Sequence, residues 1–469
     1  MKKTLVGTII ICLLHSILLV NQDLGLNVLL FTIPLLGFLI YRMREEKVIK
    51  NKWGFLYIIP IIVLSTSYFI YDNSLKYLNF LVIPGLYFLM YITTIKPVNT
   101  FADMIVEVLN LLVKPLNFIG MFMKETMKLI PSKEHKKKVV KKNNDVLISL
   151  LVVIPVVIIV LMLLSSADSI FGGIFKNIFN IDLSFLRLDE VVTRVILFVL
   201  LFLYLGSTTF FLTQEYRKEK RVKGEEKEYK PLTLNMLLVS LNIIYVVFDI
   251  IQINSLLLHR VAKGFNYADY ARSGFFQLMT ISFINIIIVL LSKKCKEETK
   301  TKIMSIGMIL LTLIINISAF YRMFLYEQAY GYTVLRLGVY VILITEAILF
   351  IPTIVYIINK KTPILNWYLA ITIGVYSFIN CFSVDRIIAE NNIERYARTG
   401  KIDIYYLENN NYDNLNQLRQ LLPALKDNKE IFEAEKDSLD AYINSMDKDN
   451  KTTIFGYNLS KEQAKEKRD

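Results

Sequence analysis

The sequence predicts an all-α fold: a polytopic helical membrane bundle of about eleven transmembrane helices, followed by a small soluble helical tail. Two observations predict this class. Hydrophobic residues make up 54% of the 469 residues and the mean hydropathy is +0.45, which is more apolar than an average soluble protein. Apolar stretches long enough to cross about 30 Å of hydrocarbon also recur as far as Phe382. The lipid bilayer is therefore the first expected partner.

The apolar stretches form two groups, one before residue 95 and one after residue 145. We expect spans at 4–20, 25–41, 53–71, 76–94, 146–165, 191–213, 232–256, 275–292, 303–324, 333–356 and 363–382. No small-residue cleavage site follows the first stretch, which favours an uncleaved helix over a signal peptide. We therefore expect four leading helices over 1–94, a linker over 95–145 and a seven-helix core over 146–384. A helical tail over 385–446 and a disordered end over 447–469 should follow.

Every second connection between the predicted spans is basic. The cations are Arg42, Arg44, Lys47, Lys50 and Lys52, then Lys133, Lys136, Lys137, Lys138, Lys141 and Lys142, then Arg217, Lys218, Lys220, Arg221 and Lys223, then Lys293, Lys294 and Lys296, and finally Lys360 and Lys361. The positive-inside rule places these connections and the N-terminus in the cytoplasm, and an odd number of spans places the C-terminus outside. The net charge of +13 is then a sign of topology, and no nucleic-acid partner is expected.

Residues 101–130 carry a polar stripe through an otherwise apolar segment. Its members are Asp103, Glu107, Asn110, Lys114, Asn117, Lys124 and Lys128, spaced for one face of a helix. Such a helix would lie in the cytoplasmic headgroup layer, bent at Pro115, and the segment 101–142 would bind anionic lipid through its Lys-rich end. A helix packed over the inner mouth of the bundle fits the pattern equally well.

The tail differs sharply in composition from the rest of the chain. Residues 385–469 hold 14 Lys and Arg against 17 Asp and Glu, and helical patterns recur at 385–398, 413–426 and 429–446. We expect a small extracytoplasmic helical domain that binds a protein partner through 385–446. The three Cys and three His residues show no spacing typical of metal ligands. The sequence therefore predicts no disulfide, no metal site and no cofactor.

Polar residues inside the predicted spans gather in the second half of the chain. In the span 232–256, one helix face carries Asn235, Asn242, Tyr245, Asp249 and Gln252. A carboxylate facing lipid is costly, so Asp249 must face the bundle interior. We expect it to form an ion pair with Arg194 or Arg336. The same interior should hold Gln277, Asn285, Asn316, Ser318, Arg322 and Glu346. These groups either line a substrate or ion site or form interhelical bonds worth about 1 kcal/mol each.

Three aromatic and charged stretches carry a resemblance to a family. They are Leu163 to Phe171, Tyr267 to Leu278 and Tyr326 to Arg336, with a weaker match from Asn391 to Leu407. Over roughly residues 145–425 the chain resembles bacterial membrane proteins grouped as a domain of unknown function, DUF4173. The resemblance implies a multi-pass protein of the bacterial cell membrane and no particular activity. It also implies that Asp168, Asp269, Arg272, Glu327 and Arg336 lead the site candidates, ahead of Asp249.

The sequence contains no nucleotide-binding P-loop, H-E-x-x-H or G-x-S-x-G motif. We therefore expect a non-enzymatic envelope scaffold or sensor component. One alternative is a transporter or channel-like protein that uses polar groups in spans six to ten. Another is a membrane-embedded transferase that acts on a lipid-linked substrate through Asp269, Arg272 and Glu327. The full set of candidate residues is Asp168, Arg194, Asp249, Asp269, Arg272, Glu327, Arg336 and Glu346.

The parity of the spans gives a direct test of topology. An enzyme that is active in the cytoplasm alone, fused after Asp469, is expected to be inactive, because an odd number of crossings leaves that end outside. The same enzyme fused before Met1 should be active. Cytoplasmic activity of the C-terminal fusion would overturn the predicted orientation.

Overall fold

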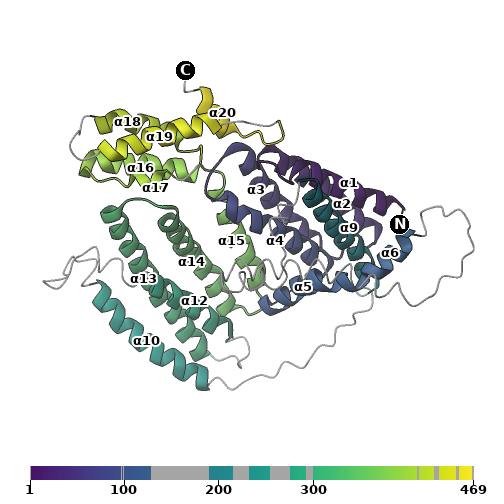
Figure 1. The fold of residues 1–469 in the computed structure, drawn as a ribbon. Coiled ribbons are helices and arrows are strands. Elements are labelled where there is room, and N and C mark those ends of the chain that lie inside the picture. Colours follow the sequence, from purple (N-terminus) through teal and green to yellow (C-terminus); the bar gives the residue numbers. More distant parts are fainter. Residues whose placement is uncertain are drawn as a thin grey trace, which may run out of the picture. The chain divides into compact units, whose positions relative to one another are not determined.

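The structure is a computed structural model. It describes residues 2–96, 98, 100–127, 190–214, 232–253, 275–291, 299–408, 411–426, 433–449 and 454–466. Every regular element in these ranges is a helix, and none of them contains a strand, which confirms the predicted all-α class. The helices are drawn in Figure 1.

The helices follow the predicted spans closely. Their bounds are α1 Lys2–Leu18, α2 Leu26–Glu45, η1 Lys52–Tyr57, α3 Ile58–Ile70, α4 Lys76–Ile95, α5 Phe101–Val113, η2 Lys114–Phe118, α6 Ile119–Met127, α9 Glu190–Gln214, α10 Leu232–Gln252, α12 Phe275–Leu291, α13 Thr299–Tyr330, α14 Val334–Ile358, α15 Ile364–Ile379, α16 Val384–Thr399, α17 Ile404–Leu407, α18 Leu415–Lys426, α19 Glu433–Asp449 and α20 Leu459–Glu466. Each predicted span has a matching helix except 146–165, which lies outside the described residues.

Among the described residues, seven helical segments are long and apolar enough to cross a membrane, or eight if α15 and α16, bent by 62°, form one span. Shorter apolar segments are Lys3–Leu18 in α1, Thr193–Thr208 in α9 and Gln277–Leu290 in α12. The chain is thus a polytopic helical membrane protein, while the count of eleven stays a prediction. One of the seven segments long and apolar enough to cross a membrane is Phe101–Thr126, where the sequence predicts a helix that lies in the headgroup layer. A crossing here would change the side on which the C-terminus lies.

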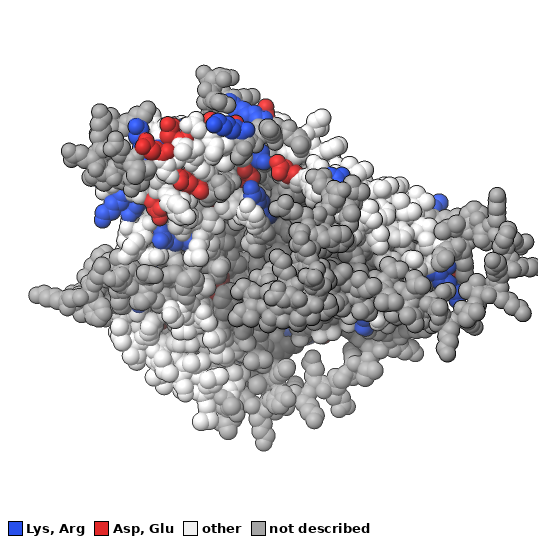
Figure 2. All heavy atoms as spheres, viewed as in Figure 1, with Lys and Arg blue, Asp and Glu red and all other residues white. Residues whose placement is uncertain are grey.

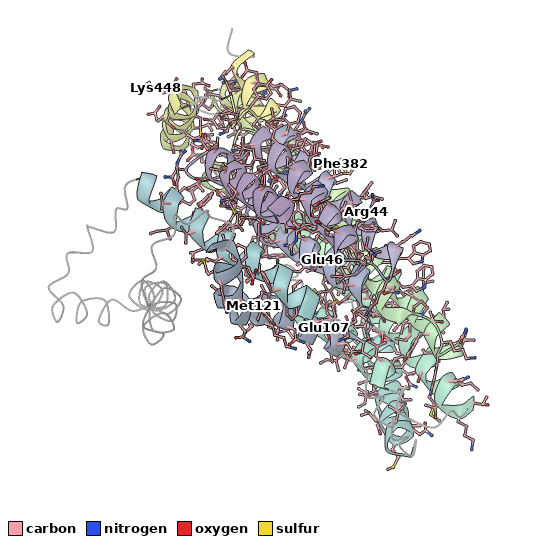
Figure 3. The ribbon with its side chains drawn as sticks, turned by 90° about the vertical axis from the view of Figure 1, so that its right-hand side faces the viewer. Arg44, Glu46, Glu107, Met121, Phe382 and Lys448 are labelled. Atoms are coloured by element: carbon pink, nitrogen blue, oxygen red, sulfur yellow. The ribbon has the colours of Figure 1, made fainter. Side chains whose placement is uncertain are left out.

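The segment 101–127 does break where its proline predicts. Helix α5 ends at Val113, and the 3₁₀ turn η2 over Lys114–Phe118 contains Pro115, whose ring cannot donate a helical hydrogen bond. Residues Glu107 in α5 and Met121 in α6 are labelled in Figure 3. Glu107 is buried and Met121 is exposed, so the polar stripe does not face away from the protein along its whole length.

The chain divides into two compact units, described separately. Unit 1 comprises residues 1–23, 33–49 and 107–220, and unit 2 comprises 24–32, 50–106 and 221–469. In unit 1, α9 packs against α1, η2 and α6. The predicted cytoplasmic cation Arg42 is in fact 1% exposed. It donates from Nη1 to the Leu205 carbonyl (2.9 Å) and to Thr208 Oγ1 (3.1 Å), because α2 continues to Glu45.

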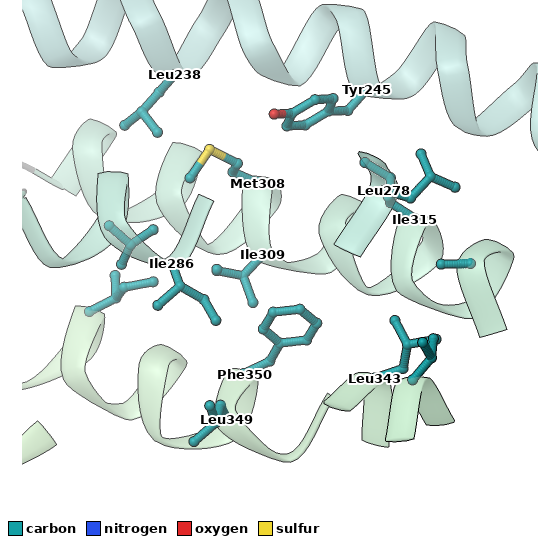
Figure 4. Packing of buried hydrophobic residues seen from close by; sticks show 14 of the residues in the cluster. Leu238, Tyr245, Leu278, Ile286, Met308, Ile309, Ile315, Leu343, Leu349 and Phe350 are labelled. Atoms are coloured by element: carbon teal, nitrogen blue, oxygen red, sulfur yellow. The ribbon is translucent and has the colours of Figure 1, made fainter. Parts of the chain in front are cut away.

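Unit 2 contains a bundle of α10, α12, α13 and α14. Helix α13 packs against each of the other three, and buried side chains such as Leu238, Met308, Ile309 and Phe350 fill the space between them (Figure 4). Inside a membrane the hydrophobic effect does not draw helices together, because lipid tails are as apolar as the side chains. Close van der Waals packing of these side chains therefore stabilises the bundle. The polar groups discussed below lie on the same helix faces.

A second group of unit 2 helices comprises η1, α3, α4 and α15, and within it η1 lies close to the backbone at the end of α4. The backbone N–H groups of Lys50 and Asn51 both donate to the Thr94 carbonyl, at 2.9 and 3.0 Å. A Cβ atom added at Gly54 would lie 2.6 Å from the Thr94 backbone nitrogen and would also overlap its hydroxyl. Glycine is therefore required where η1 passes the end of α4.

The tail helices α16 to α20 form a separate apolar core. It includes Ile388, Leu407, Leu418, Leu439 and Ala464. The expectation of disorder over 447–469 is wrong at 454–466, because α20 buries Ala464 in this core and packs against α3. On the face seen in Figure 2, charged atoms gather over the tail helices, whereas the described atoms over α10, α13 and α14 are nearly all white.

Gly54→Ala tests the close approach between η1 and α4. We expect a loss of about 1–3 kcal/mol in stability, because a backbone atom cannot yield as a side chain can. Gly85→Ala in α4 is the control, since nothing lies within 4 Å of a Cβ atom there. The control should be neutral or slightly stabilising. Thermal unfolding of the purified protein in detergent measures both, and equal melting temperatures for the two variants would contradict the prediction.

Candidate functional site

The loop between α3 and α4 is held by three carboxylates. The Asp385 carboxylate accepts hydrogen bonds from the backbone N–H of Ser74 (2.6 Å) and from its hydroxyl (2.9 Å). Asp413 accepts from the backbone N–H of Asp72 at 2.7 Å, and Asp72 in turn accepts from Lys76 Nζ at 2.7 Å. Two of these carboxylates come from the tail, so the tail supplies partners for a loop that joins two membrane helices.

The bend between α15 and α16 meets the same loop. Asn79 is 1% exposed, and its amide donates to Asn380 Oδ1 (2.6 Å) and to Ser67 Oγ (3.1 Å). Its Oδ1 accepts from the Tyr376 hydroxyl at 2.6 Å. Phe382, labelled in Figure 3, marks the bend. Because the buried Asn79 amide makes all three of these hydrogen bonds, it fixes α4 against the end of α15.

The end of the tail also contacts α3. The Asn458 amide donates to the backbone carbonyls of Tyr68 (2.8 Å) and Tyr71 (2.9 Å), which lie where α3 ends and lacks intrahelical partners. We call the six residues that carry these contacts the clasp: Asp72, Asn79, Asn380, Asp385, Asp413 and Asn458. The clasp joins the tail to α3, α4 and α15 through hydrogen bonds at buried positions.

The electrostatics of the clasp centre on Asp413. Burial raises the pKa of its carboxyl above the ordinary value, and the nearby Asp72 carboxylate raises it further. Hydrogen bonds from the hydroxyls of Ser383 and Ser460 act in the opposite direction. Burial likewise raises the pKa of the Tyr71 hydroxyl, with the Asp413 carboxylate adding to the shift.

The turn between α13 and α14 is bound by the tail as well. Gly331 has a φ of +84°, and a Cβ atom there would lie 2.5 Å from Asn392 Oδ1, so this position requires glycine. Asn392 pairs with both backbone groups of Tyr332, accepting from its N–H and donating to its carbonyl, each at 2.9 Å. The tail hydroxyl of Tyr406 accepts from the Val334 N–H at 2.7 Å.

Two arginines cap the C-terminal end of α13. Arg395 of the tail donates to the carbonyls of Gln328 (3.2 Å) and Ala329 (2.6 Å). Arg336 donates to the carbonyls of Tyr330 (3.1 Å) and Gly331. Cations are favoured at this end of a helix because the last carbonyl groups point outward unpaired. The family-like stretch from Tyr326 to Arg336 is therefore explained as a helix end and turn.

Glu327 and Arg336, both sequence candidates, are brought close together. Glu327 is buried near the end of α13, and the Arg336 guanidinium acts electrostatically on its carboxylate. Arg336 also stacks over the Tyr326 ring, 4.5 Å from its centroid. Through these contacts Arg336 stabilises the turn. In the part of the chain that the structure describes, its partners are Glu327, Tyr326 and the backbone, and Asp249 is not among them.

The predicted polar face of α10 does point into the bundle. The Asn242 amide donates to the Met304 carbonyl at 3.0 Å, and Gln252 Oε1 accepts from Arg322 Nη2 at 2.9 Å. The Tyr245 hydroxyl donates to Asn285 Oδ1 at 2.8 Å. A helix face with this many interior partners fixes α10 against α12 and α13.

Two carboxyl groups of the bundle are not fully bonded. Asp249 is 3% exposed, and neither of its carboxyl oxygens has a hydrogen-bond partner among the described residues. Glu346 is fully buried, and the Asn316 amide donates to its Oε2 at 3.0 Å, while Oε1 has no partner in the part of the chain that the structure describes. The expected ion pair between Asp249 and Arg336 is therefore not formed.

The remaining candidates are placed as follows. Asp168, Asp269 and Arg272 lie outside the described residues, and Arg194 lies on α9 in unit 1. Sequence reasoning missed the clasp, together with Asn392 and Arg395 of the tail. The available signal was the polar run Asp72-Asn73-Ser74 between two apolar spans, and a second polar run around Asp413.

The apolar helices with polar groups bonded between them define the class: an integral membrane protein with a helical bundle. A family model described as Domain of unknown function (DUF4153) matches residues 58–421, and the chain belongs to that family. The resemblance to DUF4173 thus names the wrong number, and its expected range of 145–425 begins too late, since the match includes α3 and α4. No curated protein and no solved structure matches the chain.

Asp413→Asn tests the electrostatics of the clasp. A carboxyl with a raised pKa in the folded state binds its proton more tightly when folded, so its contribution to stability falls as pH rises from the unfolded value through the folded one. The Asp413→Asn variant should lack this pH-dependent loss of stability. The melting temperatures of the wild-type protein and the variant, measured across that pH window, should therefore converge or cross. Glu394→Gln, at an exposed position on α16, should keep the wild-type profile, and a parallel profile for Asp413→Asn would contradict the assignment.

Proposed function

We propose that this integral membrane protein is a non-enzymatic scaffold or sensor of the cell envelope. In this proposal the bacterial cell membrane holds the bundle, and the tail lies outside and binds a protein partner. The observation that carries the proposal is the attachment of the tail, which is bonded at buried positions to the α3–α4 loop and to the α13–α14 turn. A tail that served merely as a tether would not need these contacts.

Rigid attachment supports a role in transmitting or organising contacts. A buried hydrogen bond that loses its partner costs about 1–3 kcal/mol, so the tail cannot leave its place without a large penalty. A partner that moved α16 would pull on the carbonyls of Gln328 and Ala329 through Arg395. Tail and bundle therefore respond to a partner together, as coupling between two sites requires.

The tail also offers a charged surface to a partner. Two ion pairs along α16, Arg386 with Glu390 (2.8 Å) and Arg398 with Glu394 (3.4 Å), are exposed. Exposed pairs of this kind contribute about 0.3–0.5 kcal/mol to a helix. Because the fold does not depend on them, they are available to recognise a partner with complementary charge.

The transferase alternative loses one of its three residues to a structural role. Glu327 is buried beside Arg336 at the end of α13, so it is not presented to a substrate at the surface. Transport is kept as a second candidate, favoured by the unbonded carboxyl oxygens of Asp249 and Glu346 inside the bundle. Intramembrane carboxyl groups commonly mark ion or proton paths.

A set of variants in a strain that lacks the protein separates these functions. Arg395→Ala removes the bonds from the tail to the end of α13 and should abolish complementation of the deletion phenotype. Ala397→Ser, at an exposed and uncharged position on the same helix, should complement fully. Truncation after Thr399 should behave like Arg395→Ala. Each variant is first shown by immunoblot to reach wild-type abundance in the membrane.

Asp249→Asn and Glu346→Gln distinguish the two candidates in the same strain. A scaffold requires the tail contacts, so these two variants should complement. Loss of complementation in both, with full activity of the Arg395→Ala variant, would replace the scaffold by a transporter.

A further inference from the structure

Two acidic side chains lie inside the bundle, and neither is hydrogen-bonded to a cation among the described residues. Glu346 is fully buried on α14 and Asp249 is almost fully buried on α10. Within the described ranges, three of their four carboxyl oxygens have no hydrogen-bond partner. The fourth, Glu346 Oε2, accepts from the neutral amide of Asn316. Neither group therefore meets the conditions under which a buried carboxylate keeps its charge.

The described helix faces around the two carboxyl groups hold few charged side chains. Their titratable and charged groups are Tyr245 on α10, Arg322 and Glu327 on α13, Tyr340 on α14 and Tyr368 on α15, and the described part of α12 contributes none. Arg322 donates to Gln252. Arg336 acts electrostatically on Glu327, so Arg322 is the cation left for Asp249 and Glu346 among the described residues. Two carboxylates against one guanidinium would leave an excess of negative charge inside a medium that disfavours any net charge.

The ligand that fits these groups is a proton. A metal ion would need several converging oxygen ligands, and the described residues contain no group of three His, Cys, Asp or Glu side chains that could hold one. A proton needs a single oxygen lone pair. At Glu346 the Asn316 bond to Oε2 leaves Oε1 as the atom to which the proton would bind.

We infer that the bundle of α10, α12, α13 and α14 is a proton-binding site, with Asp249 and Glu346 as the two proton-accepting residues. Binding forms an O–H bond at Glu346 Oε1 or at one Asp249 oxygen, and the proton comes from a hydronium ion of the aqueous phase, which becomes water. Each bound proton removes one buried negative charge. The inference stands apart from the scaffold role, because it concerns groups that the clasp does not contact.

The site has a structural route to the tail. Glu346 is bonded to Asn316, and these two residues join α14 to α13. The same two helices meet at the turn that Asn392 and Arg395 hold. A change in the Glu346–Asn316 bond on proton binding would thus act on helices whose common end the tail contacts.

Infrared spectroscopy of the full-length protein in lipid nanodiscs tests the site directly. A protonated carboxyl group gives a carbonyl stretching band that a carboxylate lacks, and the band shifts in heavy water. The wild-type protein at neutral pH should show this signal. Asp249→Asn and Glu346→Gln should each remove part of it, and Glu394→Gln, at an exposed position, should leave it unchanged.

The conservative variant Glu346→Asp is the control for the possibility that Glu346→Gln disturbs the fold. It keeps a carboxyl group and should keep a protonated band at a changed frequency. Absence of any protonated-carboxyl band in the wild-type protein would overturn the inference. So would loss of the band on adding sodium chloride at constant pH, since the site would then bind a monovalent cation.

Discussion

The hydrogen bond between Asn79 and Asn380 lies where two membrane helices and the tail come together. Tyr376 adds a second bond to Asn79 at this place, and Ser383, just past the bend, donates to Asp413 of the tail. Polar groups at such positions cannot exchange their bonds for water at low cost, so each bond fixes the helices that carry it. The loop between α3 and α4, the bend between α15 and α16, and the tail are joined to one another by these bonds.

The same constraint gives a physical meaning to the family-like stretch at the end of α13. Gly331 adopts a backbone conformation that other residues rarely take, and the open carbonyl groups before it need donors. Arg336 and Arg395 supply these donors, and Asn392 binds the peptide groups of Tyr332. A sequence pattern that looks like a site for chemistry is thus a helix end to which a separate domain is bonded.

The bundle treats its polar groups in two ways. Tyr245, Asn285 and Thr312 form a continuous row of hydrogen bonds across α10, α12 and α13, as expected for groups that fix packing. Asp249 and Glu346 belong to the same interior and have oxygens without partners among the residues that the structure describes. Neutral groups can satisfy one another inside a membrane, whereas a carboxyl group needs a countercharge or a proton, and this difference separates the proposed proton site from the structural row.

The sequence by itself determined the class of fold, the approximate bounds of the helices and the inward direction of the α10 face. These follow from local properties: apolar length, helical periodicity and the cost of a carboxylate in lipid. The tertiary structure decided which polar groups meet. Asp72 and Asp413 lie 341 positions apart in the chain, and α20 is ordered because Ala464 enters a core built by other helices. Nothing in the local pattern specifies contacts of this range, since they depend on how the helices pack and turn.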